Sequence, residues 1–278
     1  MTAALIATDL DRTLIYSRAA MTGTQYSAGN LRCIEYYEGA PLSYVTETAA
    51  RQLEDLTSAH TVVPTTTRTP EQFRRIDLPG GPWRYAITSN GGALLADGEP
   101  DEQWRRHVET AVREGGASLD EVTAELRRRI SESWVSKFRI ADGLFCYLVV
   151  DVAAQPAGFV EDWQEWCGIR GWNVSQQGRE IYTMPDSVCK SHAVAEVHRR
   201  LADEGVIDAD APVFAAGDGA LDAEMLRAAD AAIRPRHGEL ELLEWQHANL
   251  SVTEHSGIAA GEEILSWFAR SARAEGGS

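Results

Sequence analysis

Short apolar segments alternate with helical patterns along most of this chain, and this alternation constrains the fold more than any other feature. A helix is predicted from Thr46 to about Leu56. A second is predicted over residues 191–205, which carry one apolar stripe and end at a glycine. Two further surface helices are predicted at 240–245 and 261–270. Such alternation is typical of a parallel sheet covered by helices. The segments with the length and composition of buried strands are 4–8, 61–64, 85–88, 213–216, 231–233 and 250–252.

Residues 100–185 follow a different pattern. Charged amphipathic helices are predicted at 102–114 and 119–130, followed by two strands, a further helix and two more strands. The order helix, strand pair, helix, strand pair predicts an antiparallel sheet with helices on one face. We therefore expect an α/β fold in which a Rossmann-like parallel-sheet core, residues 1–99 and 186–278, contains an inserted smaller α+β domain, residues 100–185.

Composition argues against several classes of function. The 278 residues carry a formal net charge of -16 and a pI near 4.9, whereas nucleic-acid backbones and anionic membranes select basic faces. Four widely spaced cysteines form no C-x-x-C pair, which argues against a zinc site or a redox motif. The apolar N-terminal stretch stops at Asp9 with no basic region before it, and no later run is long enough for a membrane span. We expect a cytoplasmic protein that binds neither nucleic acid nor membrane.

Two acids directly follow the first predicted strand. Asp9 and Asp11, with Thr13 on the following turn, lie at the carboxyl end of segment 4–8, where open α/β sheets bind their ligands. Because side chains alternate along an extended chain, both acids project to the same side. At roughly 5 Å and an effective dielectric near 20, such a pair of like charges costs about 3 kcal/mol. The pair therefore indicates a nearby metal, lysine or shifted pKa.

Three more element ends carry polar groups. A hydroxyl-rich turn at 65–68 follows the second predicted strand and can donate hydrogen bonds to an anion. Lys190 begins a predicted helix, where its ammonium group and the helix dipole both favour an anion. Asp218 and Asp222 lie on a glycine-rich turn after another strand. Taken singly, these are a polar turn, a solvated lysine, a turn former and a helix cap. The order acid pair, hydroxyl, lysine, acid pair is hard to obtain from independent caps and turns.

These motifs resemble those of the haloacid dehalogenase (HAD) superfamily of aspartate-nucleophile phosphotransferases. The run Asp9-Leu10-Asp11-Arg12-Thr13 resembles the first motif of that family, Thr66 its second, Lys190 its third and residues 217–222 its fourth. Thr66 is chosen by aligning Thr66-Thr67-Arg68 with the Thr-Gly-Arg often found there. Segments 87–93 and 255–259 resemble features of the Cof-like branch. That branch is similar to sucrose-phosphate and mannosyl-phosphoglycerate phosphatases, and it carries a type IIB (C2) α/β cap between the second and third motifs, where the inserted domain is predicted.

The resemblance implies a phosphatase that forms an aspartyl-phosphate. Asp9 would attack phosphorus, and Asp11 would protonate the leaving alkoxide and then activate water. Thr66 and Lys190 would bind the phosphoryl oxygens and complete the catalytic set. The implied substrate is a small phosphorylated metabolite, with a sugar phosphate favoured, and the protein is expected to be a monomer or a homodimer.

Mg²⁺ is the implied cofactor, because it prefers oxygen ligands and keeps several waters. The candidate metal ligands are the Asp9 carboxylate, the Asp11 carbonyl, the Asp218 carboxylate and, directly or through water, Asp222. The candidate substrate-binding residues are polar side chains in or beside these motifs, namely Thr13, Thr67, Arg68 and Asn90.

The sequence also departs from the family pattern. Arg12 stands where many relatives have glycine, and Leu221 occupies a position often filled by asparagine; neither change removes a catalytic carboxylate. Between residues 17 and 45 the chain is longer than in compact Cof-like members, and segments 32–37 and 42–45 can pair as a hairpin around Gly39-Ala40-Pro41. The hairpin either contacts substrate or decorates the edge of the domain.

Two alternative functions stay open. A phosphomutase would return the phosphoryl group to the substrate, and a binding or regulatory protein would keep the fold without turnover. The presence of every expected carboxylate and of Lys190 argues against the second. On the inserted domain, four strand residues are candidates to face either the substrate or solvent: Lys137, Arg139, Arg179 and Tyr182.

Overall fold

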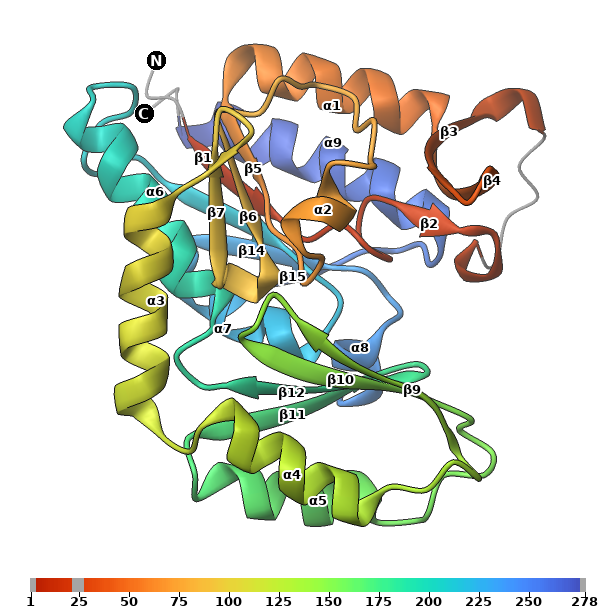
Figure 1. Cartoon of the computed structure of the whole chain (residues 1–278). Coiled ribbons are helices and arrows are strands. Elements are labelled where there is room, and N and C mark those ends of the chain that lie inside the picture. The colour runs from red at the N-terminus through yellow and green to blue at the C-terminus, as the bar shows by residue number, and fades with distance from the viewer. Residues whose placement is uncertain (1–3, 22–27, 276–278) are drawn as a thin grey trace. The chain divides into compact units, whose positions relative to one another are not determined.

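The computed structural model of the chain describes residues 4–21 and 28–275, so residues 22–27 of the insertion lie outside the described part. The described residues form two compact units. One contains the chain up to Pro100 together with the chain from Lys190 onward, and the other is Asp101–Cys189. Figure 1 labels the elements of both units.

A parallel sheet forms the centre of the first unit, as predicted, and it contains five of the six predicted strands. Its strands lie in the order β15-β14-β13-β1-β5. Because β1 lies between β13 and β5, the segments that follow these three strands meet at one edge of the sheet. The strand bounds, in the same order, are Leu250–Val252, Ala231–Arg234, Val213–Ala216, Leu5–Thr8 and Thr61–Pro64.

Helices cover both faces of this sheet. α1 (Glu47–Ala59) and α9 (Ile258–Glu275) lie side by side on one face, and α6 (Lys190–Asp203) and α7 (Ala223–Ala228) cover the other (Figure 1). Thr46 caps α1 as predicted, because its hydroxyl accepts a hydrogen bond from the third amide of the helix at 2.9 Å. Shorter helical segments are α2 (Pro70–Phe73) and the 3-10 turns Arg18–Ala20, Ala28–Asn30, Ser89–Gly91 and Ala220–Asp222.

Two predicted helices differ in length from the observed ones. The segment predicted at 240–245 forms a single turn, α8 (Glu239–Leu242), because Glu244 has a left-handed backbone with a φ of 50°, which cannot continue a helix. The segment predicted at 261–270 is longer and forms the whole of α9. Its apolar face, which includes Ile264 and Phe268, is fully buried in the core.

The strand predicted at 85–88 is present but does not extend the parallel sheet. It forms β6 (Tyr85–Thr88), which pairs antiparallel with β7 (Ala93–Ala96), and β7 pairs with β8 (Glu99–Pro100). A single bridge between Thr65 and Ile87 connects β6 to the end of β5. The reason is the tight turn after β6, whose left-handed residues reverse the chain at once, so that the next segment pairs beside it.

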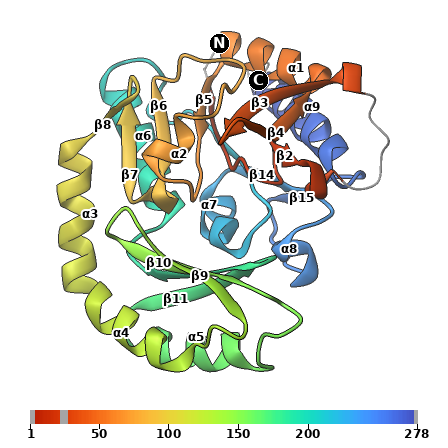
Figure 2. The ribbon, with the colours of Figure 1, turned by 45° about the vertical axis from the view of Figure 1, so that its right-hand side comes forward.

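The hairpin predicted in the insertion is confirmed. β3 (Leu31–Tyr37) and β4 (Ala40–Thr46) are antiparallel, and β2 (Tyr16–Ser17) pairs with β4 to complete a three-stranded sheet. The turn consists of Glu38 and Gly39, both left-handed, whereas the next two residues already belong to β4. Figure 2 shows this sheet close to α1 and α9, both of which contact β4.

The second unit contains the predicted antiparallel sheet with helices on one face. α4 (Leu119–Arg129) and α5 (Phe159–Gly168) pack on this sheet, and α3 (Glu102–Gly115) precedes them. The indole N–H of Trp163 on α5 donates to Oγ1 of Thr183 at 2.9 Å, a buried contact between helix and sheet. The strands lie in the order β11-β12-β10-β9, with bounds Trp172–Gln177, Glu180–Pro185, Phe145–Val150 and Val135–Ala141.

The opposite face of this sheet is polar and aromatic. Arg139, Tyr147, Tyr182 and Ser175 pair across the four strands, one register position from the row that contains Thr183 and therefore on the face away from α5. Lys137 lies on the same face, two residues before Arg139. Among the candidates on this domain, Arg179 lies in the exposed turn before β12 and not on a strand, because β12 begins one residue later.

All four cysteines are free. Among the described residues, no helix combines the length and the apolar character that crossing a lipid bilayer requires.

Candidate active site

Three carboxylates and one ammonium group lie together at the carboxyl edge of the parallel sheet. Asp9 follows β1, Asp218 and Asp222 follow β13, and Lys190 is the first residue of α6. Nζ of Lys190 donates to Oδ1 of Asp9 at 2.7 Å and to Oδ1 of Asp222 at 2.5 Å. All four side chains are buried. The fold thus brings together residues from the first, third and fourth motifs.

The electrostatics of this cluster are unfavourable without a further cation. Three carboxylates and one ammonium group leave an excess of negative charge in a buried space. Burial, together with the charge of Asp222, outweighs the attraction of Lys190 and raises the pKa of Asp9 to about 7. Burial and the two neighbouring carboxylates also raise the pKa of Asp218 well above its usual range. Although burial alone would lower it, the charges of Asp222 and Asp9 raise the pKa of Lys190.

The three carboxylates fit the requirements of a metal site. One oxygen from each of Asp9, Asp218 and Asp222 lies within 4.8 Å of the others, and carboxylate oxygens are ligands that hard divalent cations prefer. A bound cation would also relieve the repulsion among the three carboxylates. The sequence predicts that Asp11, the fourth candidate ligand, binds through its main-chain carbonyl, and its carboxylate is not part of this trio.

The loop after β1 holds Asp9 through its own residues. Oγ1 of Thr13 donates to Oδ2 of Asp9 at 2.9 Å. Arg12 has a left-handed backbone with a φ of 64°, a conformation that favours glycine. Two contacts hold Arg12 there: its Nε lies 3.6 Å from Oδ2 of Asp218, and its carbonyl oxygen accepts a hydrogen bond from Nε2 of His237 at 2.7 Å. These contacts explain how this chain tolerates arginine where many relatives have glycine.

His237 supports the site without belonging to any predicted motif. Its Nδ1 accepts a hydrogen bond from the amide of Gly257 at 3.0 Å, so the proton resides on Nε2 and is donated to Arg12. Burial lowers the pKa of His237, which favours this neutral form. A histidine between two glycine-bearing loops gives no periodicity or spacing signal, so sequence analysis had no means of finding it.

Two glycines leave the space that Asp218 and Asp222 of the fourth motif occupy. A Cβ at Gly217 would lie 2.4 Å from the side chain of Asp222, and a Cβ at Gly238 would lie 2.6 Å from the carbonyl oxygen of Asp218. Oδ2 of Asp222 also accepts a hydrogen bond from the amide of Gly219 at 2.9 Å. Any side chain at the first two positions would therefore displace a carboxylate of the cluster.

The hydroxyl-rich turn after β5 is joined to the turn after β6. Thr66 is fully buried, and its Oγ1 accepts a hydrogen bond from the amide of Arg68 at 3.1 Å. The amide of Asn90, which is also buried, donates to the carbonyl oxygen of Thr66 at 2.9 Å. Thr67, which lies between Thr66 and Arg68 in the sequence, is half-buried. The second motif and Asn90 are therefore held together next to β1.

Arg68 connects Asp11 to the insertion hairpin. Its Nε and Nη2 donate to the two carboxylate oxygens of Asp11 at 2.7 and 2.8 Å, and its Nη1 donates to Oε2 of Glu35 at 2.8 Å. Although burial opposes it, the charges of Asp11 and Glu35 raise the pKa of Arg68. Arg68, a candidate substrate-binding residue, is thus engaged by two carboxylates of the protein. The sequence analysis did not find Glu35, whose only signal is an acid inside an apolar and aromatic strand.

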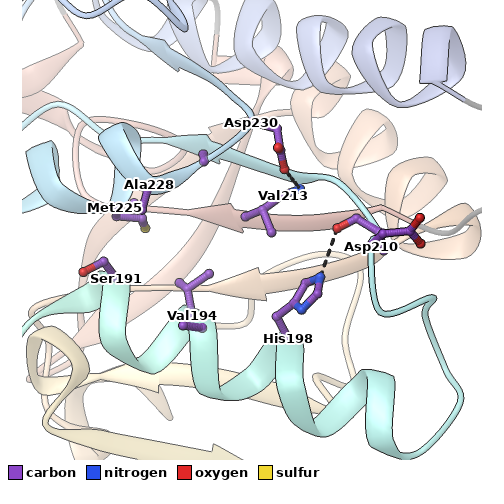
Figure 3. Close-up of a pocket in the computed structure, with 11 residues that line it drawn as sticks. Ser191, Val194, His198, Asp210, Val213, Met225, Ala228 and Asp230 are labelled. Carbon is purple, nitrogen blue, oxygen red and sulfur yellow. Dashed lines mark hydrogen bonds between the residues drawn. The ribbon is translucent and has the colours of Figure 1, made fainter.

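A separate pocket of about 500 Å³ lies in the first unit beside α6 (Figure 3). Val194 and Met225 give it apolar walls, and His198 contributes an imidazole ring. It is also lined by Val213, the first residue of β13, whereas Asp218 follows the end of that strand. The pocket therefore lies near the amino ends of the strands, and no residue predicted for the site lines it.

Comparison with protein-family models gives no match, and neither does comparison with the curated proteins. Solved structures match over nearly the whole chain. The sucrose-phosphatase from Synechocystis, solved with sucrose and phosphate, is 15% identical with a TM-score of 0.67, covering 97% of this chain and 99% of that one. A trehalose-6-phosphate phosphatase related protein is 18% identical with a TM-score of 0.55, covering 98% and 100%. A HAD subclass IIB sugar phosphatase is 11% identical with a TM-score of 0.56, covering 96% and 99%.

At these identities the likeness concerns the fold. The parallel core sheet with helices on both faces and the inserted antiparallel sheet are both present here, in the chain order that the motifs predict. The chain thus has the fold of the haloacid dehalogenase superfamily, in its Cof-like form with an α/β domain inserted into a Rossmann-like core.

Proposed function

We propose that this chain is a Mg²⁺-dependent phosphatase that hydrolyses a small phosphorylated metabolite through an aspartyl-phosphate intermediate. The observation that carries the proposal is the buried cluster of Asp9, Lys190, Asp218 and Asp222 at the carboxyl edge of the sheet. Such an arrangement offers a nucleophile, a cation site and a fixed ammonium group within a few ångströms. The similar structures named above are those of phosphatases or a phosphatase-related protein, which supports the same class of reaction.

Asp9 is the nucleophile in the first step. Thr13 and Lys190 bind its two oxygens and hold the carboxylate in one orientation. One oxygen attacks phosphorus, the bond from phosphorus to the leaving oxygen breaks, and Asp11 gives its proton to that oxygen. Thr66 and Lys190 donate hydrogen bonds to the phosphoryl oxygens as negative charge is redistributed.

Water completes the reaction in the second step. Asp11, now ionised, takes a proton from water while the water oxygen attacks phosphorus of the acyl phosphate. The bond between phosphorus and the Asp9 oxygen breaks, which releases inorganic phosphate and restores both carboxyl groups to their starting forms.

Mg²⁺ is the cofactor in this proposal. The Asp9 and Asp218 carboxylates and the Asp11 carbonyl would hold the ion, with Asp222 binding directly or through water. When bound, it neutralises charge on the phosphoryl group and on the carboxylates that surround it.

A sugar phosphate is the favoured substrate. The inserted domain carries a row of side chains, Arg139, Tyr147, Tyr182 and Ser175, on the sheet face away from α5. The rings of Tyr147 and Tyr182 have centroids 5.4 Å apart, and the hydroxyl of Tyr182 donates to Glu180 at 2.8 Å. Aromatic rings with polar neighbours offer both apolar contact and hydrogen bonds, the combination that a sugar requires.

Phosphate release from a panel of sugar, nucleotide and glycerate phosphates tests the proposal. We expect Mg²⁺-dependent release, fastest from a sugar phosphate, that a chelator abolishes and that added Mg²⁺ restores. Products should be analysed together with phosphate. An isomerised product without phosphate would indicate a mutase, and a protein that binds a phosphoester without turning it over would indicate a binding role; either result contradicts the proposal.

Mg²⁺ should stabilise the protein more at pH 8 than at pH 6. The cation needs ionised carboxylates, and burial raises the pKa of Asp9 to about 7 and that of Asp218 well above its usual range, so protons compete with the metal at the lower pH. At a concentration one hundred times its Kd, a ligand stabilises the folded state by about 2.7 kcal/mol. Thermal unfolding with Mg²⁺ and with chelator at both pH values measures the difference.

The variant Asp218→Asn provides the control for that measurement, because it removes one ligand charge and should lose most of the Mg²⁺-induced shift. Equal shifts at the two pH values would contradict the competition between protons and metal at these carboxylates.

A further inference from the structure

Glu35 is a buried carboxylate that belongs to none of the recognised motifs. It lies in β3 of the insertion hairpin, and its side chain is fully inaccessible to solvent. An ionised carboxylate in such a place costs free energy unless donors and cations surround it. A buried acid on an edge hairpin is therefore informative through the groups that it binds.

Three side chains bind Glu35. Oγ of Ser43, on the partner strand β4, donates to Oε2 at 2.6 Å, and Nη1 of Arg68 donates to the same oxygen at 2.8 Å. Nη2 of Arg75 lies 3.4 Å from Oε1. Because Ser43 belongs to the same hairpin, the hairpin fixes Glu35, and Glu35 fixes one edge of the Arg68 guanidinium group.

Arg68 transmits this constraint to Asp11. Its Nε and Nη2 make a bidentate pair with the two oxygens of Asp11 at 2.7 and 2.8 Å, which specifies both the position and the plane of a carboxylate. The guanidinium group is planar and rigid, so a contact at Nη1 sets the direction in which Nε and Nη2 point. The Asp11 side chain is 47% exposed, whereas that of Arg68 is 13% exposed, so the arginine is the more buried partner of the pair.

We propose that Glu35 is a positioning residue that sets the orientation of the Asp11 carboxylate through Arg68. The inference rests on the proposed function, in which Asp11 transfers the proton in both steps. Glu35 touches neither the acid trio nor Lys190 in the structure, so it should influence the rate of the chemical steps and not the binding of Mg²⁺ or substrate. The insertion hairpin is thereby part of the catalytic apparatus and not a decoration of the domain edge.

The variant Glu35→Gln tests this role, because it keeps the shape and the oxygen that Ser43 and Arg68 bind but removes the charge. We expect kcat to fall roughly tenfold, less than the 10²- to 10⁴-fold that general acid–base catalysis supplies, with KM and the Mg²⁺-induced shift in unfolding temperature unchanged. Glu47→Gln is the matched control. Glu47 forms an ion pair at 2.8 Å with Arg32 of the same hairpin, but it is partly exposed and unconnected to Asp11, so its kcat should equal that of wild type.

A double-mutant cycle with Arg68→Gln identifies the route of the effect. If Glu35 acts through Arg68, the double variant will have the kcat of Arg68→Gln alone; losses that multiply would overturn the proposal. If Glu35→Gln does not fold, Ser43→Ala removes the hydroxyl that donates to Glu35 at 2.6 Å and accepts from Nη2 of Arg68 at 3.4 Å, and it should lower kcat in the same direction at unchanged KM. An active wild type with an unchanged kcat in Glu35→Gln overturns this inference alone, whereas a wild type without phosphatase activity overturns the proposed function and this inference with it.

Discussion

Replacing Asp9 with asparagine will abolish phosphate release. An amide does not attack phosphorus as a carboxylate does, so the covalent intermediate cannot form and the reaction cannot be divided into two easier steps. Loss of a nucleophile that acts together with a proton-transfer partner removes most of the rate enhancement, and we expect kcat to fall by more than about 10³-fold. The measurement is phosphate release from the best substrate of the panel at saturating Mg²⁺.

The Asp9→Asn protein should nevertheless remain folded. Asparagine has the same shape and keeps an oxygen that can accept a hydrogen bond from Lys190 or Thr13. Because burial raises the pKa of Asp9 from 3.8 to about 7, the stability associated with its protonated form is lost as the pH rises through about 7. Asparagine carries no charge at any pH. In the absence of metal at pH 8, the free energy of unfolding of the Asp9→Asn protein should therefore equal or exceed that of wild type. Urea denaturation measures the two values.

A matched aspartate separates loss of the nucleophile from loss of any negative charge. Asp203 lies at the end of α6, 65% exposed and paired with Arg199, and Asp203→Asn should keep the wild-type rate. A folded Asp9→Asn protein that retains a substantial share of wild-type activity would show that another group attacks phosphorus.

The fold and the acid cluster could be predicted because local sequence encodes them. An apolar run of four or five residues specifies a buried strand, and the glycine and acid residues after it specify where the strand ends. Once β1, β5 and β13 are parallel neighbours, their carboxyl ends meet at one edge, so the motifs that contain Asp9, Thr66 and Asp218 lie at that edge. Lys190 joins them because it begins the helix that follows the inserted domain.

The pairing of β6 could not be predicted in the same way. Its four residues have the composition of a parallel strand, and only the left-handed backbone of Ser89 and Asn90 turns the chain so that it pairs antiparallel with β7. Asn90 and Gly91 are residues that often adopt positive φ angles, so the sequence contains a turn signal after β6. That signal alone does not show which strand β6 pairs with.

Glu35 illustrates a second limit. Its partner Arg68 is 33 positions away along the chain, and the contact depends on how the insertion hairpin packs on the turn after β5. An acid in a strand is normally assigned to the solvated face, and only tertiary contacts show that this one is buried. The acidic cluster and the Glu35 network thus differ in kind, because the first follows from sheet topology and the second from packing.

Among the variants named above and below, Lys190→Met should have the largest loss in free energy of unfolding. The side chain is 1% exposed and bridges Asp9 and Asp222. Methionine fills a similar volume but leaves two buried carboxylates without their shared cation, and breaking a buried ion pair in this way costs about 3–5 kcal/mol. The loss should be smaller at pH 5 than at pH 8, because Asp9, with a pKa of about 7 already, is protonated at the lower pH and needs no counter-charge. Urea denaturation of the metal-free protein at both pH values measures the free energy of unfolding.

Two further variants show whether charge is the cause. Arg199→Met removes a cation from the same helix, but its ion pairs with Glu196 and Asp203 lie at the surface, so the free energy of unfolding of this variant should stay close to that of wild type. Combining Lys190→Met with Asp222→Asn removes one of the two carboxylate charges that Lys190 neutralises in wild type. The double variant should recover part of the lost stability, without recovering phosphate release. If Lys190→Met were as stable as wild type at pH 8, the carboxylates would have to be neutral or solvated in the folded protein, and a buried, charge-compensated cluster could no longer be the basis of the site.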